Sequence, residues 1–296
     1  MDNNEKFIIL SDGTIYDGIG FGSDKEVLGE IVFNTSMTGY QEMLTDPSYR
    51  GQILVSTYPM IGNYGIDDNF SESKRVQVKS YVVRDLCDYP FHFSNDKDLN
   101  KFLTENEIPG IHSVDTRSLT RKIRKFGSKM AIVTSNPDIN TALDKINNFG
   151  SYEDNNYVDQ VSVKSIESYQ AKQSHLKIAL IDFGVKKNII RILNSRGCDV
   201  EVYPWDFDFN NLDLNKFDGI VMSPGPGDPK TLLNDIKGIK KSIENIPTLG
   251  ICLGHQIIAH IYGGETFKLL FGHRGGNQPV KEINSGRVYP TSQNHG

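Results

Sequence analysis

The sequence predicts an α/β protein in which a β-rich mixed domain precedes an open, mainly parallel α/β sheet. In the first half, short runs of Val, Ile and aromatic residues end at Gly, Asp or Pro, a pattern typical of strands. In the second half, strand-like runs alternate with helical patterns, which indicates a parallel sheet covered by helices. The length of 296 residues is sufficient for two such domains.

The first half contains four apolar runs that we interpret as strands. They cover residues 7–13, 29–34, 52–59 and 76–83. Glycines 18, 20 and 22 form a weak cluster that we interpret as a β-turn, because no Walker lysine loop accompanies it.

One amphipathic helix is predicted between Asp115 and Phe126, where Leu119, Ile123 and Phe126 recur at helical spacing. The opposite face carries the basic residues Arg117, Arg121, Lys122, Arg124 and Lys125. Such a face is most often solvated. The alternative is that it docks onto an acidic surface of a partner.

Between about 137 and 175 apolar content falls, and we expect a loosely structured connection there. The predicted organisation is an N-terminal domain over 1–150, a linker over 151–175 and a second domain over 176–296. In the second domain we expect strands at 177–183, 199–205, 218–222 and 248–252, and helices at 185–195, 232–245 and 254–264. Gly197 should end the first of these helices in a left-handed conformation.

Composition excludes several classes of protein. The net charge of −5 and the pI of about 5.8 disfavour a nucleic-acid partner. No run of eighteen apolar residues suggests a membrane span, and the N-terminus does not read as a signal or transit peptide, so we expect a cytoplasmic location. The cysteines, at 87, 198 and 252, are too widely spaced for a metal knuckle, and we expect no metal site.

The most informative segment is Gly250-Ile251-Cys252-Leu253-Gly254, which lies between an apolar run and a helical pattern. A nucleophile elbow has this arrangement, because glycines on both sides relieve crowding around a strained central residue. The N-terminus of the following helix favours a thiolate. A lone cysteine is usually a small core residue, but this glycine frame predicts that Cys252 is a nucleophile.

A second feature is the proline- and glycine-rich loop 223–229, which follows the predicted strand ending at Met222. Loops at the carboxyl ends of parallel strands are where open α/β sheets bind ligands. The loop alone is a rigid turn. One strand before an elbow cysteine, it is predicted to form a wall of the same site.

Together, the elbow GICLGHQ and the loop SPGPGDP resemble the class I glutamine amidotransferase domain. The resemblance implies the open sheet of that family and release of ammonia from glutamine through a cysteine thioester. It implies that Cys252 is the nucleophile and that Gly225 and the Leu253 N–H face the oxyanion. The further residues that it implies for glutamine binding are Ser36, Gly227, Gln256, Asn294 and Gly296.

The first half distinguishes among members of that family. Residues 29–65 and 108–127 are similar to the N-terminal domain of carbamoyl phosphate synthetase small chains, and Ser36 matches a serine that contacts glutamine. Residues 181–193, 271–280 and 291–296 continue the likeness. The resemblance implies a large-subunit partner that holds ATP and Mg and makes carbamoyl phosphate, with no cofactor in this chain. It leaves open whether the product serves pyrimidine or arginine biosynthesis.

The sequence departs from the family in one respect. A Gly-His-Pro-Glu segment, which would supply the base, is missing, and we expect the sequence to be C-terminally incomplete and to hydrolyse glutamine poorly as given. His255 lies three residues after Cys252, and we predict a packing or hydrogen-bonding role for it. Two alternatives are a catalytically silent glutamine-binding or regulatory scaffold and an amidotransferase of another pathway. The Ser36 region disfavours the second alternative.

Overall fold

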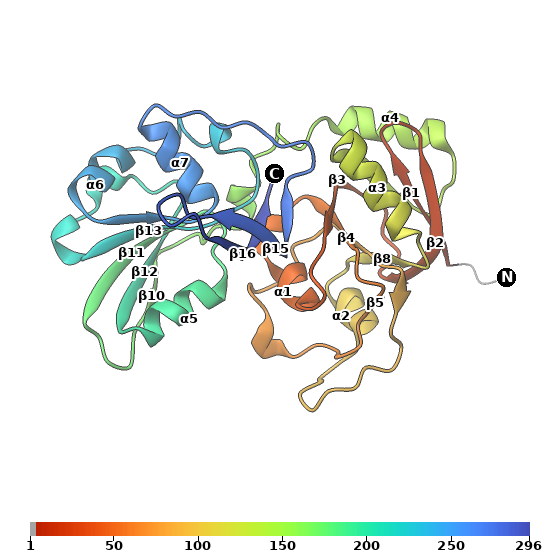
Figure 1. The fold of residues 1–296 in the computed structure, drawn as a ribbon, viewed down its shortest axis with the longest axis horizontal. Coiled ribbons are helices and arrows are strands. Elements are labelled where there is room, and N and C mark those ends of the chain that lie inside the picture. The colour runs from red at the N-terminus through yellow and green to blue at the C-terminus, as the bar shows by residue number, and fades with distance from the viewer. Residues whose placement is uncertain (1–3) are drawn as a thin grey trace. The chain divides into compact units, whose positions relative to one another are not determined.

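The computed structural model describes residues 4–296, which form two compact units (Figure 1). Unit 1 comprises the chain up to Thr45, Gly51–Tyr152 and Lys268–Gly296. Unit 2 comprises Asp46–Arg50 and Glu153–Phe267. The structure therefore groups the last 29 residues, Lys268–Gly296, with unit 1, whereas the sequence prediction placed them in the second domain.

Unit 1 is built around a closed barrel, with strand order β1-β2-β8-β6-β4-β3-β9. Closure depends on β9, which pairs antiparallel with both β1 and β3, and it leaves the barrel without a free edge. The strands are β1 (Glu5–Leu10), β2 (Ile15–Gly22), β3 (Val27–Asn34), β4 (Gln52–Ser56), β6 (Ser80–Val82), β8 (Pro109–His112) and β9 (Lys129–Thr134).

The composition of the barrel core is explained by side chains that point to alternate faces along these strands. Ile8, Leu10, Ile31 and Ile53 belong to one buried cluster, each at most 1% exposed. Ile9, the neighbour of Ile8 and Leu10, belongs to a different cluster, because successive strand side chains point to opposite faces. The barrel wall is therefore buried on both faces along β1.

The predicted β-turn at residues 18–22 is wrong, since these residues end strand β2. The glycines are explained by neighbouring main-chain segments that lie very close to them. A Cβ on Gly18 would lie 2.4 Å from the carbonyl oxygen of His112, and one on Gly22 would lie 2.4 Å from that of Ile108. A side chain at either position would push the adjacent main-chain segment away.

The strand predicted over 76–83 is limited to Ser80–Val82, and that part of the prediction is wrong for the preceding residues. Val76 and Val78 are buried, but the N–H groups of Gln77 and Lys79 donate to single carbonyls outside a ladder. Beside the barrel lies a two-stranded parallel sheet of β5 (Met60–Ile61) and β7 (Asp85–Leu86).

The α-helices among the described residues of unit 1 are α1 (Tyr40–Thr45), α2 (Leu99–Glu105), α3 (Thr116–Phe126) and α4 (Ile139–Phe149). The predicted amphipathic helix is α3, with Leu119 and Ile123 buried, although Phe126 is exposed. Helix α4 corrects the loosely structured connection predicted from residue 137. Asp138 caps its first turn by accepting the Thr141 N–H, and Ala142 and Ile146 bury a narrow face against Ile9 and Ile132.

The final segment of unit 1 is an antiparallel hairpin of β15 (His273–Lys281) and β16 (Val288–His295), with a register shift between Gly275 and Gln278. It meets the end of β3 through Thr35, whose N–H donates to the carbonyl of Arg274 at 3.2 Å. This bond joins the hairpin to the barrel.

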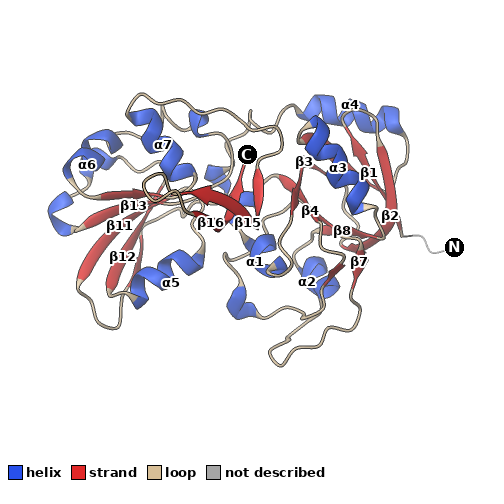
Figure 2. Ribbon diagram, in the orientation of Figure 1, coloured by secondary structure: helices blue, strands red, loops and turns tan. Residues whose placement is uncertain are grey.

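Unit 2 contains a five-stranded sheet of order β10-β12-β11-β13-β14, in which β10 alone is antiparallel. The predicted mainly parallel α/β sheet is therefore present (Figure 2). The strands are β10 (Glu167–Tyr169), β11 (Leu176–Asp182), β12 (Cys198–Pro204), β13 (Gly219–Met222) and β14 (Thr248–Gly250). Strand β10 and the 3₁₀ turn at Val158–Gln160 lie in the segment predicted as a linker.

Helices cover both faces of this sheet. Figure 1 shows α6 (Ile239–Asn245) and α7 (Leu253–Ile261) on one face and α5 (Lys187–Ser195) on the other. Ile181 packs with the first pair of helices and Leu180 with α5, as expected for alternating strand residues.

Two helix predictions for unit 2 have different outcomes. The helix predicted over 232–245 is wrong in its first half, because Gly238 has φ 76° and the helix begins only after it. The predicted stop after α5 is confirmed, with Gly197 at φ 79°.

Further 3₁₀ turns occur at Pro47–Tyr49, Asp68–Phe70, Phe209–Asn211, Leu214–Lys216 and Pro229–Thr231. Within residues 4–296, none of the helices has the length and apolar character needed to cross a bilayer.

Candidate active site

The predicted elbow is present in unit 2, where β14 ends at Gly250, α7 begins at Leu253 and Cys252 lies between them as the N-cap residue. Its φ of 51° and ψ of −108° are strained for a residue with a side chain. Cys252 is only partly buried and forms no disulfide. The thiol therefore stands at a helix N-terminus, whose dipole favours a thiolate.

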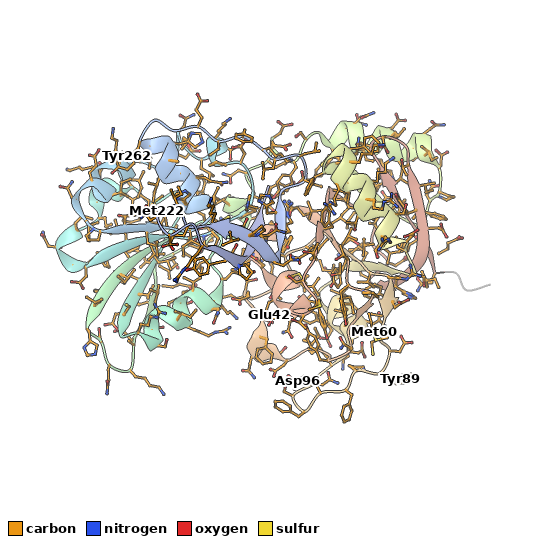
Figure 3. The ribbon with its side chains drawn as sticks, in the orientation of Figure 1. Glu42, Met60, Tyr89, Asp96, Met222 and Tyr262 are labelled. Atoms are coloured by element: carbon orange, nitrogen blue, oxygen red, sulfur yellow. The ribbon has the colours of Figure 1, made fainter. Side chains whose placement is uncertain are left out.

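Glycines permit this turn to lie against the neighbouring strand. A Cβ on Gly254 would lie 2.3 Å from the carbonyl oxygen of Met222, the last residue of β13, which Figure 3 labels. A Cβ on Gly250 would lie 2.7 Å from the Cα of His255. Both predicted frame glycines are thus required by close backbone contacts.

The loop after β13 reaches the elbow within the same unit. The Gly254 N–H donates to the carbonyl of Ser223 at 3.1 Å. A Cβ on Gly225 would lie 2.8 Å from Cδ2 of Leu253. In the described chain, neither the Leu253 N–H nor the Gly225 N–H donates a hydrogen bond. Two available donors beside a cysteine could stabilise an oxyanion, because such donors act where negative charge develops.

The turn after β11 packs against this loop. A Cβ on Gly225 would lie 2.2 Å from the carbonyl oxygen of Phe183, and one on Gly184 would lie 3.2 Å from the Cα of Gly225. The Ser223 hydroxyl accepts the Phe183 N–H at 2.9 Å and donates to the Pro224 carbonyl at 2.8 Å. The loop is therefore fixed by main-chain packing.

Asp182 holds the same turn. Its buried carboxylate accepts the N–H groups of Gly184 at 2.9 Å, Val185 at 2.7 Å and Val163 at 2.8 Å. Burial raises the pKa of Asp182, and the three N–H bonds act in the opposite direction. Sequence reasoning missed Asp182 and Ser223. The available signal was a polar residue at the end of each buried strand.

The other glutamine residues predicted in unit 2 also lie along these segments. Gln256 is partly exposed in the first turn of α7, and its N–H donates to the Cys252 carbonyl at 3.0 Å. Gly227, with φ 88°, lies in the loop after β13, where an added Cβ would come no closer than 3.9 Å to the Asn155 carbonyl oxygen. The structure therefore brings Cys252, Gly225 and Leu253 together, with Gln256 and Gly227 on adjoining positions.

The remaining predicted residues, Ser36, Asn294 and Gly296, belong to unit 1. The Ser36 N–H donates to Oδ1 of Asn34 at 2.7 Å, and its hydroxyl lies 3.9 Å from a Cβ placed on Gly276. Asn294 is the register partner of Arg274 in the hairpin. These three residues therefore gather around the hairpin and the end of β3.

His255 does not have the predicted packing or hydrogen-bonding role. It is exposed on α7, and within residues 4–296 its ring forms no hydrogen bond. The Cα of His255 packs against Gly250, whereas the His255 side chain is exposed to solvent. Among the described residues, no three His, Cys, Asp or Glu side chains are grouped so that they could hold a metal ion.

Comparison with known proteins identifies the family. Residues 8–133 match the model of the carbamoyl-phosphate synthase small chain CPSase domain, and residues 179–296 match glutamine amidotransferase class-I. The carbamoyl phosphate synthase small chain of Clostridium perfringens (strain 13 / Type A) is 46% identical over 292 residues, covering 98% of this chain and 82% of that protein. The chain belongs to the carbamoyl phosphate synthase small chain family.

A second relative gives a similar match. That of Methanopyrus kandleri is 47% identical over 294 residues, with 98% of this chain and 81% of the relative covered. Among solved structures, an aminopeptidase from Aneurinibacillus sp. strain AM-1 gives a TM-score of 0.28 at 10% identity over 88% of this chain and 69% of that one, which is too weak for any inference.

The two family matches fall on the two sheets of this small chain. The first begins in β1 and ends at Val133 in β9, so it includes all or part of every strand of the barrel. The second begins at Ala179 in β11 and includes the elbow and the hairpin. The α/β architecture with a class I amidotransferase region is therefore established, and the family resemblance inferred from the motifs is confirmed.

Proposed function

We propose that this chain is the glutamine-hydrolysing subunit of a carbamoyl phosphate synthase. The Cys252 thiolate attacks the side-chain amide carbon of glutamine and forms a tetrahedral oxyanion. The C–N bond then breaks, the nitrogen takes up a proton from solvent water and leaves as ammonia, and a thioester remains. Water hydrolyses the thioester to glutamate and returns the thiolate.

The observation that supports this proposal most directly is the position of Cys252. A strained thiol at a helix N-terminus lies in one loop cluster with the Leu253 and Gly225 N–H groups, neither of which donates a hydrogen bond within residues 4–296. Such donors would stabilise the oxyanion, a term that is usually large in acyl transfer.

We further propose that Ser36, Gly227, Gln256, Asn294 and Gly296 contribute to glutamine binding. Ammonia passes to a large partner chain, which uses ATP and Mg to make carbamoyl phosphate, and this chain itself needs no cofactor. The relatives' designation as small chains supports such a partner. On the sequence grounds given above, we place the reaction in the cytoplasm.

A glutamine-analogue electrophile tests the nucleophile. Incubation of the full chain with a chloroketone analogue of glutamine, followed by peptide mass spectrometry, should give one adduct at Cys252, and excess glutamine should suppress it. Cys87 and Cys198 are internal controls. A chain that binds glutamine without forming the adduct would instead be the silent scaffold. Ammonia release with the large partner tests turnover.

A further inference from the structure

The two proposed oxyanion donors differ in what fixes their direction. No peptide bond within residues 4–296 is cis, and in a trans peptide the N–H points away from the preceding carbonyl. The Leu253 N–H shares its peptide with the Cys252 carbonyl, which accepts the Gln256 N–H at 3.0 Å within α7. The Gly225 N–H shares its peptide with the Pro224 carbonyl, in a loop outside the helices and strands. Helix α7 therefore aims the first donor, and the second needs another constraint.

The residue that carries the second donor leaves its peptide plane free to rotate. Gly225 must be a glycine, because an added Cβ would lie 2.2 Å from the carbonyl oxygen of Phe183. Glycine has a wide range of φ, and proline fixes only its own φ, so the Pro224–Gly225 plane can turn through ψ of Pro224 and φ of Gly225. A half-turn would exchange the N–H and the carbonyl. A carbonyl oxygen would then stand where the proposed site requires a donor.

The side chain of Ser223 supplies the missing constraint. Ser223 is fully buried, and its hydroxyl donates to the Pro224 carbonyl at 2.8 Å. The same hydroxyl oxygen accepts the Phe183 N–H at 2.9 Å. A hydroxyl has a single hydrogen, and here the Pro224 carbonyl takes it. Pro224 is buried and Gly225 is partly exposed, so the bond holds the carbonyl on the interior side and leaves the Gly225 N–H on the opposite side of the plane.

Rotation of this plane would leave a buried polar group without a partner. The Pro224 carbonyl would turn away from Ser223, whose hydroxyl hydrogen has no other acceptor within residues 4–296. The inward-turned Gly225 N–H would offer that hydroxyl a second donor, which does not satisfy its hydrogen. Because an unpaired buried donor is costly, the observed direction of the Gly225 N–H is the stable one.

Ser223 is held in place by its own main chain. Its N–H donates to the carbonyl of Ile181 in β11 at 3.1 Å, and its carbonyl accepts the Gly254 N–H of α7, also at 3.1 Å. Both bonds belong to the backbone, so replacement of the Ser223 side chain leaves them intact. The hydroxyl therefore acts from a fixed position between the sheet and the elbow helix, and its effect on the Gly225 N–H can be tested separately.

We propose that Ser223 is a positioning residue that aims the Gly225 N–H at the oxyanion by holding the Pro224 carbonyl. The inference rests on the proposed function, since it concerns the same oxyanion. Ser223 contacts neither the substrate nor the thiol, and it acts where negative charge develops on the substrate oxygen. Loss of its hydroxyl should therefore slow reactions that place an oxygen between the two donors, and should leave the reactivity of the Cys252 thiolate unchanged.

Two reagents that attack the same thiol test this role in the full chain. The chloroketone analogue of glutamine carries its ketone oxygen at the position of the amide oxygen, and the thiolate displaces its chloride. Iodoacetamide alkylates by direct displacement of iodide and needs no oxyanion donor. In Ser223→Ala, the chloroketone at saturation should react with Cys252 about tenfold more slowly than in the wild type, and iodoacetamide should react at the wild-type rate. Ser223→Thr keeps the hydroxyl and should recover most of the chloroketone rate.

The matched control is Ser242→Ala. Ser242 is a buried serine of the same unit, and its hydroxyl also donates to a main-chain carbonyl, that of Gly238 at 3.4 Å. This variant should react with both reagents as the wild type does. An equally slow chloroketone reaction in Ser242→Ala would mean that loss of any buried hydroxyl has this effect, and would overturn the proposal.

The wild-type protein provides a second measurement in case Ser223→Ala does not fold. In a crystal structure of the chloroketone adduct, the adduct oxygen should lie within hydrogen-bond distance of the Gly225 nitrogen, with the Ser223–Pro224 bond retained. A rotated Pro224–Gly225 peptide, or an adduct oxygen away from Gly225, would overturn the proposal.

The rates also separate the two levels of inference. If Ser223→Ala forms the chloroketone adduct as fast as the wild type, or is slowed equally with both reagents, only the positioning role of Ser223 fails. In the second case Ser223 would support the elbow as a whole. If the wild type reacts with iodoacetamide at Cys252 but not with the chloroketone, the proposed function fails and the positioning role fails with it.

Discussion

The two units differ in the backbone strain of their non-glycine residues. In the described part of the barrel unit, the non-glycine residues with positive φ are Glu107 at 58° and Ser113 at 63°, values usual for left-handed turn residues. In the sheet unit the described example is Cys252, whose ψ of −108° takes it outside that region as well. The core of the closed barrel is filled by apolar side chains, whereas the strands of an open parallel sheet end in loops that can hold a strained residue. The most strained of these residues is therefore the one proposed as the nucleophile.

Substitution of Cys252 should give the largest effect. Cys252→Ala and Cys252→Gly should both lower ammonia release by about 10³-fold or more, because the nucleophile is removed. The glycine variant should be more stable than the alanine variant by about 1–2 kcal/mol, since only glycine adopts this φ and ψ without strain. Denaturant unfolding of the two variants measures the difference. Equal stabilities would mean that the elbow stores no strain, and the contrast between the units would disappear.

Gly225→Ala should reduce turnover by about 10²-fold, because the new Cβ overlaps the Phe183 carbonyl oxygen at 2.2 Å and displaces an oxyanion donor. Steady-state kinetics with the large partner should show the loss in kcat more than in KM. Gly263→Ala is the control, since no atom lies within 4 Å of its added Cβ. Normal kcat in Gly225→Ala would remove this loop from the reaction.

Gly254→Ala should destabilise the sheet unit by about 2 kcal/mol, because its Cβ would lie 2.3 Å from the Met222 carbonyl oxygen and the strand must shift. Gly263→Ala, strained by its φ of 84° but uncrowded, should cost about 1 kcal/mol. Urea unfolding of both variants tests the order. If Gly263→Ala proves the more damaging, backbone conformation rather than close packing governs this helix.

The smallest effect is expected in the barrel, at Asp12. Burial acts to raise the pKa of Asp12, but hydrogen bonds from Thr14 and Lys122 lower it to about 2. Lys122 lies 3.0 Å from the carboxylate and Lys129 3.7 Å. Because the folded pKa is depressed, the stabilisation is present above about pH 4 and is lost as the pH falls toward 2.

Asp12→Asn should therefore lower the free energy of unfolding by about 1 kcal/mol at pH 7, allowing for solvent exposure of the pair. The difference from wild type should shrink below pH 4. Unfolding curves at pH 7 and pH 3 provide the measurement. A difference that grows on acidification would have the wrong sign for this ion pair.

The elbow could be predicted from sequence because its requirements are local. Glycines two positions either side of Cys252 indicate a strained turn whatever the rest of the chain does, and β14 and α7 lie where that pattern placed them. Which residues bind glutamine is not decided by local pattern, and these assignments remain predictions. Asp182 was missed because its role depends on three N–H groups that only the folded chain brings together.

The barrel was harder to predict because its closure is non-local. Strand β2 was not predicted, because its glycines are required by the close approach of the carbonyl oxygens of His112 and Ile108, about ninety residues away in the sequence. Helix α4 was missed because only Ala142 and Ile146 anchor it, within a segment otherwise rich in polar residues.

The Thr35–Arg274 bond has a consequence for synthesis, because it joins residues 239 positions apart. All seven barrel strands have been synthesised once Thr134 has been added, and the hairpin is synthesised roughly ten seconds or more later at ordinary elongation rates. During that interval the loop after β3 lacks its final neighbour. The nascent barrel can therefore close before this loop is in place, so loop docking comes late in folding.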